Sequence, residues 1–200
     1  MTKIKMCGLS RLCDIEYANE VKPDFIGFVF AGKSKRYVSP EKACELRQKL
    51  DRGIISVGVF VDADIDFIAE LVNNSTIDIV QLHGSEDESY IKNLRKLTDV
   101  PIIQAFRIEK ISDTKKAELS TADYVLLDSG GGSGKTFDHS LIENIKRPYF
   151  LAGGLTPENV GKISRKLEPY AVDASSSLET DGYKDINKMR AFAKALGRKD

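Results

Sequence analysis

The sequence has 200 residues, 42% of them hydrophobic and 30% charged, and its 30 Lys and Arg balance its 30 Asp and Glu. This composition predicts one globular domain, and the charge balance argues against a nucleic-acid partner. The apolar runs are strand-like, well below the roughly 18 residues of a membrane helix. The sequence begins with MTKIKM and shows no signal-type segment there, so we expect a cytoplasmic protein with no membrane partner.

Eight short, continuously apolar runs predict buried parallel strands, at 3–6, 25–30, 54–61, 77–82, 101–106, 124–127, 149–152 and 170–173. The segments between them have helical spacing. Residues 39–50 and 156–167 begin with Ser or Thr followed by Pro, and 62–74 and 85–97 begin with acidic first turns. A strand followed by a helix, eight times over, predicts a single (β/α)₈ barrel spanning residues 1–200.

Polar and small residues follow the apolar runs, and in such a barrel the carboxyl ends of the strands carry the chemistry. The candidates are Cys7, Arg36, Asp62, Gln81, His83, Arg107, Asp128, Gly153, Gly154 and the serines 175–177. A thiol, carboxylates, arginines and an imidazole that converge on one face indicate an active site.

Most of these residues also have a purely structural interpretation. Cys7 could be a small buried hydrophobic residue, Arg36 and Arg107 could form surface salt bridges, and His83 could only bond a neighbouring loop. We expect Asp62 to cap the third helix.

The remaining cysteines and histidine give no framework for a disulfide or a metal. Cys13 and Cys44 lie in helical segments, where a structural role is expected, and three cysteines without a C-x-x-C pattern argue against disulfides. His83 and His139 stand far apart, so no zinc site is predicted.

The stretch LLDSGGGSGKTFD, residues 126–138, suggests a phosphate-binding P-loop at first sight. That motif needs a glycine at position 129, where Ser129 stands, and Asp128 would face the phosphates. We interpret the stretch as a glycine-rich loop beside Asp128 that could close over a substrate. Gly153-Gly154 and the serines 175–177 fit a phosphate site better, because barrels hold phosphate after their seventh and eighth strands; two ordinary turns are the alternative.

The motifs KMCGLS, IGFVFAGKSKRYVSP, VGVFVD, VQLHG, AFR, LLDS with GGSGKTFD, LAGGLTPENV and VDASSSLE follow one another along nearly the whole chain. In this order they resemble the phosphoribosylanthranilate isomerases of tryptophan biosynthesis. The resemblance implies a (β/α)₈ barrel that performs an Amadori rearrangement of N-(5-phosphoribosyl)anthranilate, a phosphosugar, without metal or cofactor.

Carried over to this sequence, the resemblance gives roles to individual residues. Cys7 is similar to the general base, Asp128 to the general acid and Arg36 to the residue that holds the anthranilate carboxylate. The phosphate clamp would comprise Gly132, Gly154, Ser175 and Ser176. From their places at the strand ends, Gln81, His83 and Arg107 are further candidates for the lining of the site. The chemistry would suit a lowered pKa at Cys7 and a raised pKa at Asp128.

One departure from the family pattern falls in the phosphate clamp: Ser177 stands where the family usually has glycine, and a positive φ there would be costly. Other phosphosugar isomerases or epimerases, a P-loop nucleotide-binding protein and a catalytically silent barrel are the rival hypotheses. No exposed apolar helix face stands out, so we expect a monomer rather than a homodimer.

Overall fold

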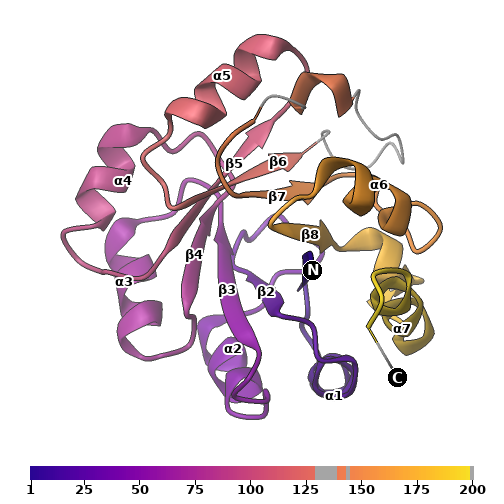
Figure 1. The fold of residues 1–200 in the computed structure, drawn as a ribbon. Helices are drawn as coiled ribbons and strands as arrows, with labels where there is room; N and C mark the ends of the chain where they lie inside the picture. Colours follow the sequence, from indigo (N-terminus) through magenta and orange to yellow (C-terminus); the bar gives the residue numbers. More distant parts are fainter. Residues whose placement is uncertain (129–138, 143–144, 199–200) are drawn as a thin grey trace.

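The computed structural model describes residues 1–128, 139–142 and 145–198. Eight parallel strands form a closed barrel in chain order, and helices surround it (Figure 1). The strands are β1 (Lys3–Cys7), β2 (Phe25–Val29), β3 (Ile55–Phe60), β4 (Ile79–Leu82), β5 (Ile102–Arg107), β6 (Tyr124–Asp128), β7 (Tyr149–Ala152) and β8 (Ala171–Ala174). The predicted (β/α)₈ barrel is confirmed, and each apolar run overlaps a strand whose ends differ by at most two residues from the prediction.

The helices are shorter than predicted, because the first residues of the predicted segments form caps and residues 48–50 and 95–97 form turns or bends. They are α1 (Leu12–Val21), α2 (Pro40–Arg47), α3 (Ile65–Asn73), α4 (Glu88–Leu94), α5 (Ile111–Leu119), α6 (Val160–Leu167) and α7 (Ile186–Ala195). Ser39 caps α2 by accepting a hydrogen bond from the Lys42 N–H, and Pro40 opens the helix, as expected. In the described part of the β6–β7 connection, the helical element is only the 3₁₀ turn η1 (His139–Ile142).

The prediction that Asp62 caps the third helix is wrong. Asp64 is the N-cap of α3, and its side chain accepts a hydrogen bond from the Asp66 N–H. Asp62 itself has a φ of 49° and accepts from both the N–H and the hydroxyl of Ser85, at 2.7 and 2.8 Å. It therefore ties the loop after β3 to the loop after β4.

Apolar side chains fill the part of the barrel interior that lies away from the carboxyl ends of the strands. This cluster comprises Phe25, Val57, Ile79, Ile103, Leu126, Phe150, Ala152 and Ala171. All occupy alternate positions of their strands, which in a closed barrel face the interior. A smaller group of Cys7, Val29 and Val59 lies at the carboxyl ends of β1, β2 and β3. Because this layer is packed, the carboxyl ends of the strands are where a cavity can form.

A small hairpin follows β8 and covers part of this end. After the 3₁₀ turn η2 (Ser176–Leu178), strands β9 (Glu179–Thr180) and β10 (Tyr183–Lys184) pair antiparallel. Their two-residue turn, Asp181-Gly182, has φ values of 53° and 82°, the backbone that an Asp-Gly hairpin turn favours. The hairpin brings Glu179 and Lys184 to the barrel mouth.

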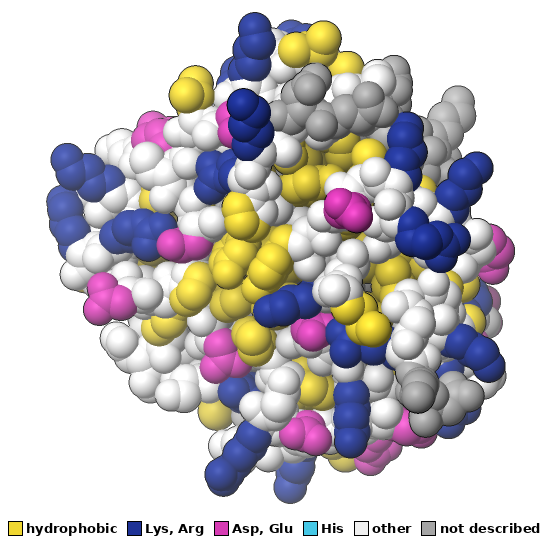
Figure 2. Space-filling model, viewed as in Figure 1, with side chains coloured by type: hydrophobic (Ala, Val, Ile, Leu, Met, Phe, Trp, Pro, Cys, Tyr) yellow, Lys and Arg dark blue, Asp and Glu magenta, His cyan; other side chains and the backbone are white. Residues whose placement is uncertain are grey.

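The outer surface carries both signs of charge. On the face shown in Figure 2, basic and acidic side chains are interspersed, and hydrophobic side chains gather towards the middle. Among the helices that the structure describes, none is long and apolar enough to cross a membrane.

Candidate active site

A cavity of about 760 Å³ opens at the carboxyl ends of the strands. Its volume is within the usual range for small-molecule sites. Ten of the candidate residues line it together: Cys7, Arg36, Gln81, His83, Asp128, Gly153, Gly154, Ser175, Ser176 and Ser177. Strand-end positions that are far apart in the sequence thus share one space, as the barrel topology requires.

Three of the candidate residues are not placed in this cavity, and the first is Asp62, which binds Ser85. Gly132 and the rest of the glycine-rich loop, residues 129–138, lie outside the described residues. Arg107 ends β5 as expected, but it is not among the described residues that line the cavity. Its side chain is 70% exposed and its Nε lies 2.8 Å from Oε1 of Glu109. The surface salt bridge is therefore the better interpretation of Arg107.

Cys7 is the last residue of β1 and is buried, with 8% of its surface exposed. It pairs with Gly27 on β2, and a Cβ at position 27 would lie 2.6 Å from the Cys7 sulfur. Burial raises the pKa of the Cys7 thiol, while the charges of Lys5 and Lys184 act in the lowering direction. The expected lowering of this pKa is thus not found, because the loss of hydration outweighs the nearby cations.

Substituting Gly27 by alanine should displace the Cys7 thiol from the cavity. The new methyl group would need the space of the sulfur, and both residues are on adjacent strands that cannot separate. We expect kcat to fall by at least about tenfold while the fold is retained. Steady-state kinetics with circular dichroism checks this, and Gly53→Ala, whose Cβ would meet nothing closer than 3.5 Å, is the matched control. An unchanged kcat would contradict the tight fit.

Asp128 ends β6 and shares the cavity with an imidazole. Oδ2 of Asp128 lies 3.8 Å from Nε2 of His83, and Nδ1 of His83 lies 2.9 Å from the side-chain nitrogen of Gln81. The amide nitrogen can only donate, so Nδ1 accepts and the neutral ring carries its proton on Nε2. Burial lowers the pKa of His83, although the charge of Asp128 opposes this. His83 is therefore a neutral ring that turns an N–H towards the carboxyl group.

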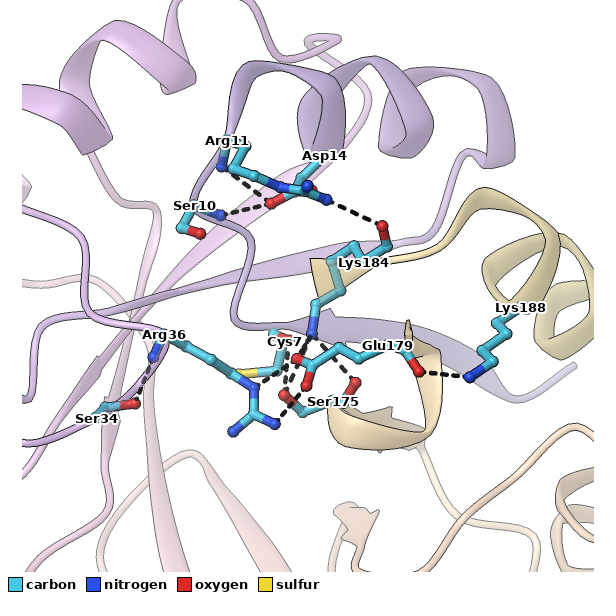
Figure 3. Close-up of polar contacts among 10 residues, drawn as sticks. All are labelled: Cys7, Ser10, Arg11, Asp14, Ser34, Arg36, Ser175, Glu179, Lys184 and Lys188. Atoms are coloured by element: carbon cyan, nitrogen blue, oxygen red, sulfur yellow. Dashed lines mark hydrogen bonds and ion pairs between the residues drawn. The ribbon is translucent and has the colours of Figure 1, made fainter. Parts of the chain in front are cut away.

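Arg36 is held by Glu179 on the hairpin (Figure 3). Its Nε and Nη2 donate to the two carboxylate oxygens at 2.6 and 2.7 Å, and Lys184 also pairs with Glu179. Within the described part of the chain, no hydrogen bond engages Nη1 of Arg36. A guanidinium group can bind carboxylates along more than one edge, so the edge formed by Nη1 and Nη2 stays available to a ligand.

The loops after β7 and β8 form the other end of the cavity. Gly153 and Gly154 have φ values of 89° and 63°, and the side chain of Asn159 donates to the Gly154 carbonyl at 2.9 Å. The Ser175 hydroxyl donates to the Cys7 carbonyl at 2.9 Å. Ser177 lies in η2 without a positive φ, so a serine is accommodated there without backbone strain.

Sequence reasoning missed four charged residues at or below the site: Lys5, Asp173, Glu179 and Lys184. Lys5 and Asp173 do carry a signal, because a charged residue inside a strand buried on both faces needs a partner. The hairpin residues carry none, since their position depends on how a short turn folds back. Among the described residues, no three His, Cys, Asp or Glu side chains are grouped so that they could hold a metal ion.

A family model for N-(5'-phosphoribosyl)anthranilate isomerase matches residues 4–195. The chain belongs to this family. The N-(5'-phosphoribosyl)anthranilate isomerase of Endomicrobium trichonymphae is 46% identical over 201 residues, with 98% of each chain covered. The resemblance drawn from the motifs is confirmed, and the chain is an isomerase of tryptophan biosynthesis that interconverts an aldose and a ketose.

Solved phosphoribosylanthranilate isomerases share the fold. One, in complex with reduced 1-(o-carboxyphenylamino)-1-deoxyribulose 5-phosphate, is 34% identical with a TM-score of 0.88, and 98% of each chain is covered. Another, a monomer generated from the dimeric enzyme of Thermotoga maritima, is also 34% identical, with a TM-score of 0.87 and 98% of each chain covered. Because that relative is described as dimeric, the monomeric state of this chain stays a prediction.

Proposed function

We propose that this isomerase carries out the Amadori rearrangement of N-(5-phosphoribosyl)anthranilate with Cys7 as general base and Asp128 as general acid. The observation that carries the proposal is the placement of these two groups in one cavity, at the carboxyl ends of β1 and β6. In the closed strand order, β7 and β8 separate β1 from β6, so the groups approach a bound substrate from different sides. Two proton transfers at different atoms of one sugar need such an arrangement.

The first transfer opens the ribose ring. Asp128 in its protonated form donates to the ring oxygen, and the anthranilate nitrogen forms a Schiff base with C1′. The neutral His83 lies next to Asp128, with its Nε2 3.8 Å from Oδ2 of the carboxyl group. The two side chains thus border the same part of the cavity, where the ring oxygen of the substrate would lie.

The second transfer gives the product skeleton. The Cys7 thiolate removes the proton from C2′, and the resulting enamine tautomerises to the ketone. The side-chain oxygen of Gln81 is buried at the cavity and has no hydrogen-bond partner among the described residues, so a substrate hydroxyl is a fitting donor for it. Such a bond would fix the sugar between the two catalytic groups.

The two charged groups of the substrate, its carboxylate and its phosphate, bind to different parts of the cavity. The free edge of Arg36 suits the anthranilate carboxylate, because a planar guanidinium can donate two parallel hydrogen bonds to it. The small residues of the loops after β7 and β8, Gly154, Ser175 and Ser176, let the backbone approach the phosphate, and the Ser176 hydroxyl adds a donor.

Replacing Arg36 by lysine should raise KM much more than it lowers kcat. The charge stays, but the forked geometry that can bind Glu179 and a substrate carboxylate at the same time is lost. We expect KM to rise by about 10- to 100-fold, which corresponds to the loss of one charge-assisted hydrogen bond. Steady-state kinetics measures both constants. Arg107→Lys, which changes an exposed arginine outside the described lining, is the control, and an equal effect of both variants would refute the role of Arg36.

The reaction can be tested directly with substrate generated in situ from anthranilate and phosphoribosyl pyrophosphate. The protein, added without metal, should accelerate the decay of the anthranilate-type fluorescence well above the spontaneous rate. A folded protein that leaves the decay at the spontaneous rate would overturn the proposed reaction.

A further inference from the structure

A largely buried ion pair lies inside the barrel, at the wall of the cavity. Lys5 on β1 has no exposed surface, and its Nζ lies 3.0 Å from both carboxylate oxygens of Asp173 on β8. The two residues are register partners on adjacent strands. Buried ion pairs rarely stabilise a fold, because the loss of hydration offsets the attraction. This pair therefore calls for a functional explanation.

Its position relative to Cys7 supplies one. Lys5 and Cys7 are alternate residues of β1 and face the same side of the strand, which is the barrel interior. The ammonium group of Lys5 is the strongest charge acting to favour the Cys7 thiolate, and the same interaction favours the charged form of Lys5. Cys7 and Asp173 both line the cavity, so the ion pair borders the same space as the Cys7 thiol.

The other charges around Cys7 come from several elements. Lys184 on β10 and Arg36 after β2 also attract a thiolate, but Glu179 binds both of them. Asp173 repels a thiolate, and Asp173 is in turn repelled by the charge of Asp128. Lys5 favours the Cys7 thiolate more strongly than Asp173, its counter-ion, disfavours it.

We propose that Lys5 is a positioning residue that stabilises the thiolate of Cys7 from within the barrel, and that Asp173 competes with this thiolate for the Lys5 ammonium group. The inference rests on the proposed function in so far as the thiolate is the general base. Burial favours the neutral thiol, and a fixed ammonium group in the same low-dielectric interior provides the opposing attraction. Lys5 does not need to touch the substrate for this effect.

The thiolate can be measured without any isomerase assay, from the rate of alkylation of Cys7 by iodoacetamide as a function of pH. Trypsin places the three cysteines in separate peptides, residues 6–11, 12–33 and 43–47, so mass spectrometry follows Cys7 alone. Cys13 and Cys44 serve as internal references in every sample.

Lys5→Met and Asp173→Asn should move the alkylation profile in opposite directions. Without the Lys5 ammonium group, the midpoint should rise by about one pH unit or more, which slows alkylation of Cys7 about tenfold at neutral pH. Without the Asp173 carboxylate, Lys5 is left to the thiolate and alkylation should accelerate. If the ion pair had only a structural role, the two variants would not shift the alkylation midpoint in opposite directions. Unchanged profiles, or shifts in the same direction, would overturn the inference.

Two further variants complete the test. Lys3→Met removes a charge from the same strand, but the Nζ of Lys3 bonds the Tyr170 hydroxyl at 2.8 Å, at the other end of the barrel, so no shift is expected. If Lys5→Met does not fold, Lys5→Met/Asp173→Asn leaves no ion unpaired. It should still slow alkylation, because Lys5 influences the thiol more than Asp173 does.

Isomerase kinetics on the same variants separates this inference from the proposed function. Lys5→Met should lower kcat by about the same factor as the thiolate fraction and leave KM unchanged. A shifted alkylation profile with an unchanged kcat would support the electrostatic role of Lys5 and contradict the role of Cys7 as base. If the alkylation profile did not shift and Cys7→Ala were inactive, the result would contradict the proposed role of Lys5 but not the role of Cys7 as base.

Discussion

Replacing Cys7 by alanine should lower kcat by about 10²- to 10⁴-fold, the usual contribution of a general base. The cavity and its other polar groups would remain, so the substrate should still bind and KM should change little. The reason is that the thiol lines the cavity at the end of β1, where only it can take the C2′ proton in the proposed mechanism. The fluorescence assay with substrate generated in situ measures the rate.

The two other cysteines provide matched controls for this prediction. Cys13 in α1 and Cys44 in α2 are half-buried thiols that do not line the cavity. Their alanine variants should keep nearly the full rate. A Cys7→Ala enzyme with more than a tenth of the wild-type kcat would mean that another group removes the proton.

Replacing Asp128 by asparagine should lower kcat by a similar factor, about 10²- to 10⁴-fold, because the amide cannot donate the proton that opens the ribose ring. The change is nearly isosteric, so the nearby His83, 3.8 Å from the carboxylate, should keep its place. Stopped-flow fluorescence under single-turnover conditions measures the loss without a contribution from product release.

Asp62→Asn is the matched control for Asp128→Asn. Asp62 also follows a strand, but it accepts hydrogen bonds from Ser85 and is not one of the described residues that line the cavity. We expect its effect on kcat to stay within about twofold. If the two asparagine variants lost activity equally, the assignment of the acid would have to be given up.

The barrel could be predicted because its signal is local. Each strand is a short apolar run buried on both faces, and the regular alternation with helical segments admits few other topologies. The strand ends then placed Cys7 and Asp128 at one mouth without any tertiary information. The helix ends were less accurate, because a capping residue such as Asp64 cannot be told from Asp62 by residue type alone.

The parts of the site that could not be predicted depend on distances between elements. The carboxylate that holds Arg36 comes from Glu179, 143 residues further along the chain. The ion pair between Arg107 and Glu109 could not be predicted either, because it depends on the direction of the backbone after β5. Likewise, whether burial or nearby cations dominate the pKa of Cys7 depends on the depth of the thiol and the reach of Lys5, which no sequence pattern encodes.

The division of labour between Cys7 and Asp128 is tested most directly by a kinetic isotope effect with substrate deuterated at C2′. We predict that the isotope effect on single-turnover conversion grows in Cys7→Ser, where removal of the C2′ proton becomes limiting. It should shrink towards unity in Asp128→Asn, where ring opening becomes limiting. Isotope effects that change in the same direction in both variants would contradict the assignment of one residue to each proton transfer.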